Sequence, residues 1–142
     1  MMQSNPFLRS YQQTRAAEVF TASPHKLIEI CLAGALERVA IAKGAMQRGD
    51  LGEKARRIAA AVAIVEHLRL SLDAKAGGEL AANLDQLYDY VIRRLTQANS
   101  GANTVEALDE VTGLLGQIKA GWDGLAANEV RAVTTPFLGV AA

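Results

Sequence analysis

Few side chains in this 142-residue sequence are of the types that catalyse reactions or bind metals. The clearest pair is Asp85 and Asp89, whose spacing of four places both carboxylates on one face of a helix. Such a pair could hold a cation or act as an acid and a base. Arg93 follows Asp89 by a further four residues, so an ordinary ion pair along the helix surface explains the pattern better.

The remaining candidates do not form a reactive or metal-binding set. The di-iron pattern of helical bundles needs Glu-x-x-His, and neither His25 nor His67 stands three residues after a glutamate. We expect both histidines to be solvated or to cap a helix. The single cysteine, Cys31, has apolar neighbours and is expected to be a small buried residue rather than a nucleophile. We therefore predict no enzyme activity, no metal and no cofactor.

The composition is that of a packed, aliphatic domain. Half of the residues are hydrophobic but only 5% are aromatic, which argues against disorder and predicts a core of Ala, Leu, Val and Ile. The 15 basic and 15 acidic residues cancel, so we expect no broad basic surface and no nucleic-acid partner. The longest apolar run, 58–65, is far shorter than the roughly 20 residues that span a bilayer. We expect a soluble, intracellular protein with no membrane insertion.

Capping residues divide the chain into four predicted helices. Ser23 before Pro24 starts the first helix, and Gly49 ends it. Asp50 starts the second helix, a turn follows at 73–78, and Asn103 caps the fourth. The predicted helices cover about residues 24–48, 50–72, 79–99 and 103–125.

Short connections between these helices make each one antiparallel to the next. The predicted fold is therefore all-α, an antiparallel up-down four-helix bundle with flexible N- and C-terminal tails. We expect residues 23–125 to form the bundle, 1–22 an N-terminal segment that could cap a groove, and 126–142 a C-terminal tail. That tail is either disordered or covers apolar surface, and the sequence leaves both alternatives open.

Apolar residues recur at alternating spacings of three and four in each predicted helix. This spacing is typical of helices that pack about 20° from antiparallel. The predicted core positions are Ile28, Leu32, Ala35, Val39, Ala42 and Met46 in the first helix; Ile58, Val62, Val65 and Leu72 in the second; Leu80, Leu84, Leu87, Val91 and Leu95 in the third; and Leu108, Val111, Leu115, Ile118 and Trp122 in the fourth.

The helices carry more apolar residues than these core positions use. A monomeric bundle has little use for apolar residues on two faces, so we expect a tail, a second copy or a partner's amphipathic segment to cover them. The alternative is that a small bundle buries wide stripes and these residues are the edges of its core. The surplus residues are Leu27, Ile30, Gly34 and Ile41 in the first helix; Ala61, Ile64 and Leu68 in the second; and Tyr88, Ile92 and Tyr90 in the third.

One stretch of the third predicted helix has a specific pattern: Leu-Tyr-Asp-Tyr-Val-Ile-Arg-Arg-Leu at 87–95, followed by Gln-Ala-Asn at 97–99. This stretch, with several others in the right order, resembles the flagellin export chaperone family, FliS. Where the family often has Tyr-Asp, this chain has Leu32 and Ala33, so contacts of that pair are not carried over. Further similar residues are Tyr11 with Gln12, Thr21 to Pro24, and Asp109-Glu110-Val111 through Trp122.

The resemblance implies a cytoplasmic helical bundle that binds the C-terminal segment of newly made flagellin. Such a chaperone would prevent premature polymerisation and support delivery to the flagellar type III export apparatus, including contact with its export gate. In relatives the N-terminal segment can lie over the binding groove when the partner is absent. Our hypothesis here is that Tyr11 occupies a pocket near the first helix and is displaced by flagellin.

The surplus apolar residues and the resemblance together give one set of candidate partner-binding positions. Arg93 and Arg94 are instead expected to stabilise the bundle through acidic partners. The competing interpretation is a non-enzymatic bundle that forms a permanent homo-oligomer or an adaptor with another helical protein. The candidate partner-binding residues are Tyr11, Leu27, Ile30, Ile64, Leu68, Tyr88, Tyr90 and Ile92.

Overall fold

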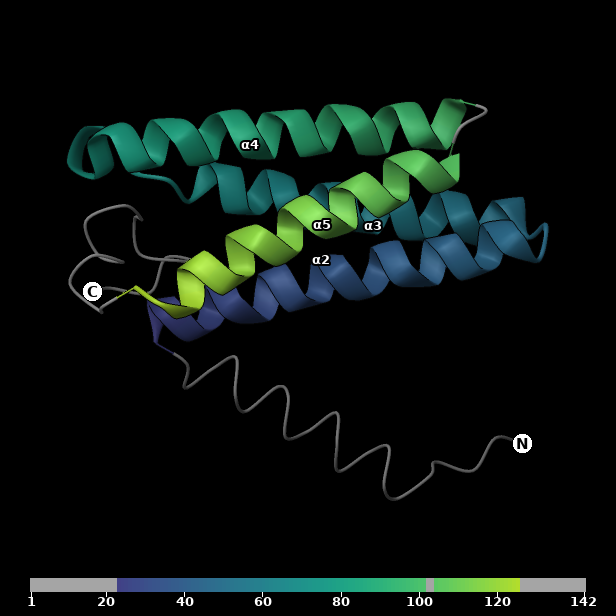
Figure 1. The fold of residues 1–142 in the computed structure, drawn as a ribbon, viewed down its shortest axis with the longest axis horizontal. Helices are drawn as coiled ribbons and strands as arrows, with labels where there is room; N and C mark the ends of the chain where they lie inside the picture. Colours follow the sequence, from purple (N-terminus) through teal and green to yellow (C-terminus); the bar gives the residue numbers. More distant parts are fainter. Residues whose placement is uncertain (1–22, 102–103, 126–142) are drawn as a thin grey trace, which may run out of the picture.

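The computed structural model describes residues 23–101 and 104–125, which form four helices (Figure 1). Helices α2 and α4 each pack against both α3 and α5, so the four helices close a ring in which each has two neighbours. Each helix runs antiparallel to the one that follows it (Figure 1). The predicted all-α four-helix bundle is confirmed. The helices are α2 (Pro24–Gln47), α3 (Leu51–Leu70), α4 (Ala74–Ser100) and α5 (Thr104–Asp123).

The predicted caps set the ends of α2 and the start of α3. The Ser23 side chain accepts a hydrogen bond from the backbone N–H of Lys26 at 3.2 Å, and Pro24 occupies the first helical position. Gly49 follows with φ +76°, a left-handed conformation that few side chains tolerate, and this ends α2. The Asp50 carboxylate then accepts from the backbone N–H of Glu53 at 3.1 Å and starts α3.

Helix α4 begins earlier than the sequence predicted. Residues 73–78 were expected to be a turn, but Asp73 accepts a hydrogen bond from the backbone N–H of Ala76 at 3.0 Å, and the helix starts at Ala74. The break is confined to Gly78, whose φ of 53° and ψ of −129° are not helical. An aspartate cap therefore nucleates one helical turn before the glycine interrupts it.

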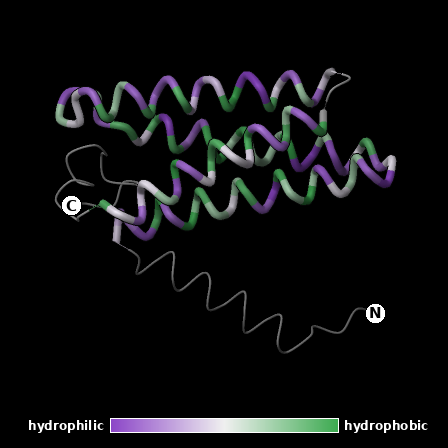
Figure 2. Tube along the Cα trace, in the orientation of Figure 1, coloured by the Kyte–Doolittle hydropathy of each residue, from purple (hydrophilic) through white to green (hydrophobic). Residues whose placement is uncertain are grey.

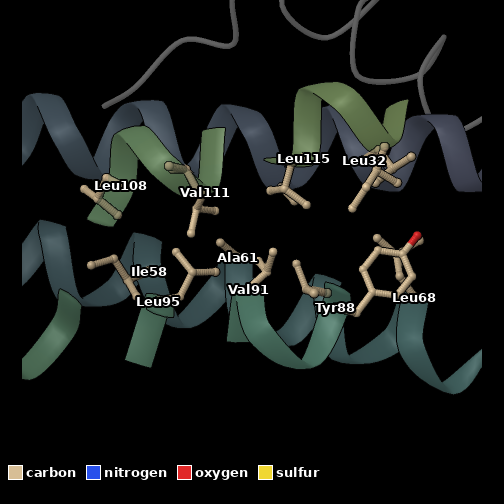
Figure 3. Close-up of a cluster of buried hydrophobic side chains, with 14 of the residues drawn as sticks. Leu32, Ile58, Ala61, Leu68, Tyr88, Val91, Leu95, Leu108, Val111 and Leu115 are labelled. Carbon is tan, nitrogen blue, oxygen red and sulfur yellow. The ribbon is translucent and has the colours of Figure 1, made fainter. Parts of the chain in front are cut away.

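The core lies along the axis of the ring, where all four helices contribute aliphatic side chains (Figure 3). Apolar positions recur along every helix, separated by polar ones (Figure 2). The predicted core positions of α5 are all buried, and so are those of α2 apart from the half-buried Met46. Spacing alone therefore identified the buried faces of these two helices.

The predicted core faces of α3 and α4 were wrong by one position at several places. Ala61 and Leu68, which were assigned to a surplus stripe of α3, are buried. In α4 the buried residue is Tyr88, 2% exposed, whereas the preceding Leu87 is 37% exposed. Consecutive helical residues differ by about 100° in direction, so two neighbouring apolar residues compete for one core position. Leu80 was likewise expected in the core, but Ala81 takes that place.

Among residues 23–101 and 104–125, every helix falls short of the combined length and hydropathy that a membrane-spanning segment requires.

Candidate partner-binding surface

An apolar groove runs between α4 and α5 and encloses about 260 Å³. Its lining contains no charged side chain. The Gln117 amide is a polar exception, and the indole N–H of Trp122 is already hydrogen-bonded to a backbone carbonyl. We call it the α4/α5 groove, and it is lined by Leu80, Leu84, Leu87, Leu114, Gln117, Ile118, Gly121, Trp122 and Leu125.

The walls of the groove come from leucines that the core does not use. Leu80 and Leu87 stand seven residues apart on one side of α4 and remain 40% and 37% exposed. Across the groove, α5 contributes the half-buried Leu114 and the exposed Gly121. A Cβ atom added to Gly121 would meet no heavy atom within 4 Å, so the glycine keeps this part of the groove hollow.

One end of the groove is closed by a contact between the start of α2 and the last turn of α5. The rings of His25 and Trp122 are stacked, with centroids 5.7 Å apart and planes inclined by 16°. The Trp122 indole N–H donates to the His25 carbonyl at 3.1 Å, and His25 Nε2 donates to the Trp122 carbonyl at 2.9 Å. The expectation that His25 only caps a helix or faces solvent missed this packing role. The contact fixes Trp122, a groove residue, in a single orientation.

Toward the middle of α4 the junction with α5 becomes polar. Glu110 accepts hydrogen bonds from Arg94 Nε at 2.6 Å and from the Tyr90 hydroxyl at 2.9 Å. The hydrogen bond from Arg94, followed by the one from Tyr90, lowers the pKa of the Glu110 carboxyl below its ordinary value. Arg93 lies over the Tyr90 ring, 5.8 Å from its centroid. The prediction that Arg93 and Arg94 act through acidic partners is confirmed, since Arg93 pairs with Asp89.

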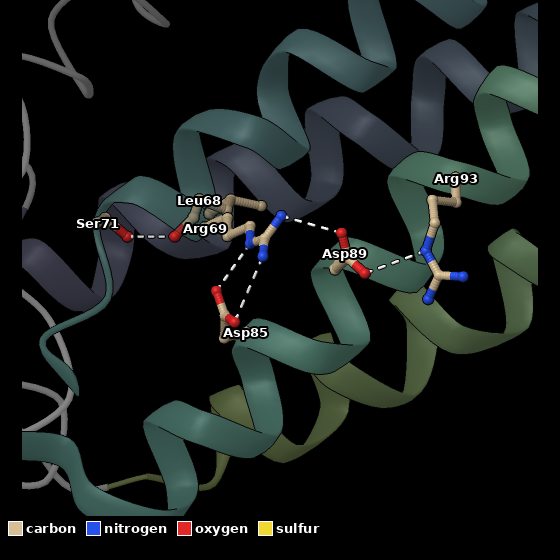
Figure 4. A network of polar contacts seen from close by, with 6 residues as sticks. All are labelled: Leu68, Arg69, Ser71, Asp85, Asp89 and Arg93. Atoms are coloured by element: carbon tan, nitrogen blue, oxygen red, sulfur yellow. Dashed lines mark hydrogen bonds and ion pairs between the residues drawn. The ribbon is translucent and has the colours of Figure 1, made fainter.

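Asp85 and Asp89 join α3 to α4 through one arginine (Figure 4). Arg69 Nε lies 2.7 Å from Asp85 and its Nη1 lies 3.0 Å from Asp89. The hydrogen bond that Arg69 donates to Asp85 is the main reason that the pKa of Arg69 is raised. Asp89 also pairs with Arg93 at 3.0 Å, as the spacing predicted. Both carboxylates are therefore committed to guanidinium groups, and the ion-pair interpretation is the correct one.

No group of three or more His, Cys, Asp and Glu side chains that suits a metal ion occurs within the described part of the chain. Cys31 is half-buried and packs against the core. Burial raises the pKa of its thiol, which disfavours the reactive thiolate.

The eight candidate partner-binding residues fall into three groups. Tyr11 lies outside the described residues, so its position stays a prediction. Leu27, Leu68 and Tyr88 are 4%, 1% and 2% exposed and belong to the core. The expectation that they form an exposed stripe is wrong, because the buried face of each helix is wide enough to include them. Ile30, Ile64, Tyr90 and Ile92 are half-buried, and only these four of the described candidates offer surface to a partner.

Two of the half-buried candidates lie together at the junction of α2 and α3. A Cβ added to Gly34 of α2 would lie 3.7 Å from Cδ1 of Ile64 in α3, and Ile30 stands one helical turn before Gly34. Gly34 itself is buried, so its assignment to the surplus stripe was wrong. We call Ile30 and Ile64 the α2/α3 face. The ring order of the helices places it on the opposite side of the bundle from the α4/α5 groove.

The residues that sequence reasoning missed are the groove leucines, above all Leu80, Leu87 and Leu114. The first two were predicted, but as core residues, because they continue the spacing of three and four set by Leu84, Val91 and Leu95. The available signal was a second series with the same spacing of seven, Ala81 and Tyr88, one position further along the helix. Two parallel apolar series on one helix indicate that only one of them can face the core.

Comparison with known proteins decides the family. The sequence matches the family described as flagellar protein FliS over residues 7–129. The chain belongs to the FliS family. The resemblance noted from the sequence is therefore confirmed.

Several curated relatives in the FliS family are similar over most of their length. Flagellar secretion chaperone FliSB of Pseudomonas aeruginosa is 48% identical over 119 residues, which cover 83% of this chain and 94% of the relative. The flagellar secretion chaperones FliS of Vibrio cholerae and Salmonella typhimurium are 39% and 40% identical over 117 residues, covering 82% and 81% of this chain and 85% and 86% of the relatives.

Proposed function

We propose that this FliS-family chain is a cytoplasmic export chaperone that binds the C-terminal segment of flagellin. Membership of the family, whose curated relatives are named flagellar secretion chaperones, supports the export chaperone role. The α4/α5 groove is the observation that supports a helical client, because its apolar lining is open to solvent. In this role the chaperone prevents premature polymerisation of the bound flagellin and supports its delivery to the flagellar type III export apparatus.

The groove suits an amphipathic helix better than a charged or polar ligand. A helix places apolar residues at spacings of three, four and seven, and Leu80 and Leu87 repeat at seven along the facing wall. If the client covers about 400 Å² of apolar surface, the gross gain is roughly 10 kcal/mol. Ordering a disordered segment offsets about 2–5 kcal/mol or more of that gain. The remainder is enough for a complex that later releases its client.

The half-buried residues of the α2/α3 face are a second apolar surface that supports an extended client. Ile30 and Ile64 belong to this face, whereas Tyr90 is hydrogen-bonded to Glu110. Ile64 and Ile92 both pack against the core while remaining half-buried. Among the eight candidates, we retain Ile30 and Ile64 as partner contacts, on the side of the bundle opposite the α4/α5 groove. The buried Leu27, Leu68 and Tyr88 support the client surface from beneath.

The test is a calorimetric titration of the full chain with a peptide of the flagellin C-terminal segment. Leu87→Arg places a charge on the groove wall and should weaken binding about tenfold or more. Leu70→Arg is the matched control, because Leu70 is 80% exposed and lies outside the groove. Equal affinities for the two variants would contradict the groove as the client site.

Sedimentation of the same samples separates the proposal from a permanent oligomer. A monomer that forms a one-to-one complex with the peptide supports the chaperone. A tight dimer that ignores the peptide supports the alternative of a self-associating bundle.

A further inference from the structure

The α4/α5 groove adjoins a segment of its own chain. Leu125 is a lining residue of the groove and lies two residues after the end of α5, where its backbone N–H donates to the Trp122 carbonyl at 3.0 Å. The chain therefore continues into residues 126–142 from the wall of the groove itself. The start of α2 also lies beside the groove, since His25 stacks on the lining residue Trp122, but no residue of α2 is itself part of the lining.

The amino-acid composition of residues 126–142 matches the lining of the groove. The groove presents leucine side chains and no charge, and the segment has only two charged residues, Glu129 and Arg131, whose charges are opposite. Because these two charges are opposite, the segment brings no net charge to the apolar groove when it binds there. Its large apolar residues are Val130, Val133, Phe137, Leu138 and Val140.

The segment is also long enough to cover the groove. Leu114 and Trp122 are the outermost groove residues of α5, and at 1.5 Å per helical residue they are separated by about 12 Å, with Leu125 lying just beyond the helix. Extended chain advances about 3.3 Å per residue, so about four residues span that distance. Val130 is five residues beyond Leu125. Each apolar residue from Val130 onward can therefore reach any part of the groove.

We propose that residues 126–142 of this chain occupy the α4/α5 groove when no client is bound, and that the flagellin segment must displace them. This inference rests on the proposed function for the identity of the competitor. A short tether gives the segment an effective concentration in the millimolar range, on the order of 1 mM, so modest contacts keep it in place. A separate client competes with it by offering a longer apolar face. The bound segment covers the groove leucines and so prevents two copies of the protein from associating through them. A client must then bind the groove more strongly than the segment does.

Photo-crosslinking within the full chain tests this occupancy directly. Phe137 is replaced by p-benzoylphenylalanine, the dilute protein is irradiated, and the crosslinked positions are mapped by mass spectrometry. We expect intramolecular crosslinks to residues of the groove, such as Leu80, Leu87 and Leu114. Crosslinks to another surface, crosslinks only between copies, or no crosslinks would overturn the proposal.

A pair of groove variants makes the test specific. Leu87→Arg should abolish the groove crosslinks, whereas the matched control Leu70→Arg should retain them. Circular dichroism identifies any variant that has lost its helices, and Leu80→Arg then replaces Leu87→Arg on the same wall. Groove crosslinks that survive the wall substitution in a folded variant would also overturn the proposal.

Adding the flagellin peptide separates this inference from the proposed function. If both hold, the peptide removes the groove crosslinks. If the crosslinks form but the peptide leaves them unchanged, the tail occupies the groove and the proposed client site is wrong. If no groove crosslinks form but Leu87→Arg still weakens peptide binding, the client site stands and the tail inference is wrong.

Discussion

Helix α4 has two neighbours, and the two junctions that it forms differ in kind. Toward α3 the junction is closed: Leu68 and Tyr88 fill it, and Arg69 holds the two helices together from outside (Figures 3 and 4). Toward α5 one end is hollow, and Leu80 and Leu87 remain partly exposed beside it. The same helix thus buries one apolar series for stability and leaves the adjacent series available for binding.

The largest expected effect comes from the closed junction. Tyr88→Ala removes a large, fully buried side chain and should lower the free energy of unfolding by about 3–5 kcal/mol. Leu87→Ala, its neighbour on the groove side, should cost only about 1–2 kcal/mol because part of that side chain is already in water. Urea denaturation of both variants measures the difference. Equal losses would mean that the two series of α4 do not have separate roles.

Hydrogen exchange compares the two junctions without any substitution. Gly113, Gly116 and Gly121 lie inside α5, and at about 1 kcal/mol each relative to alanine they favour local opening of that helix by about 3 kcal/mol. We expect the backbone amides of α5 to exchange fastest among the four helices, and those of α3 and α4 at their closed junction to be better protected. Finding α5 to be the most protected helix would contradict the expectation that the α4/α5 junction opens more readily than the α3/α4 junction.

A glycine pair separates helix stability from groove shape. Added Cβ atoms at Gly121 and Gly113 would meet nothing within 4 Å, so each Gly→Ala substitution should stabilise the protein by about 1 kcal/mol. Only Gly121 lines the groove, so only Gly121→Ala should weaken binding of the flagellin peptide. Thermal unfolding and calorimetry measure the two effects. Identical binding by both variants would show that the hollow at Gly121 is not used.

The smallest effect concerns the polar part of the open junction and depends on pH. Because Arg94 and Tyr90 lower the pKa of Glu110 in the folded chain, its contribution to stability is complete above the ordinary value of 4.5. That contribution is lost as the pH falls from this value through the lowered pKa. The stability difference between the wild type and Glu110→Gln should therefore shrink on acidification below 4.5. A difference that is constant with pH would show that this carboxylate does not stabilise the junction.

Much of the fold follows from local signals in the sequence. The Ser23 and Asp50 caps and the left-handed Gly49 act within one turn, so their effects are readable without any tertiary contact. The family resemblance rests on residues that include Asp89, Arg93 and Arg94, and the structure shows these to be ion-pairing residues.

The candidate site was less predictable, because it depends on contacts between distant segments. Arg69 binds carboxylates sixteen and twenty residues away, and His25 stacks on a tryptophan at the opposite end of the described chain. The groove itself is what remains after the helices have packed. The parallel series Ala81 and Tyr88 indicates that one of two series on α4 is left outside the core, but the sequence alone does not decide which one.

Capping chemistry and apolar spacing were thus sufficient to determine four antiparallel helices and the buried faces of α2 and α5. Only the tertiary structure decided that Ala81 and Tyr88, rather than Leu80 and Leu87, face the core. Hydropathy favours the leucine in each of these adjacent pairs, yet the structure buries its neighbour. The choice between them depends on the volume left by the facing side chains and on how closely the helix axes approach.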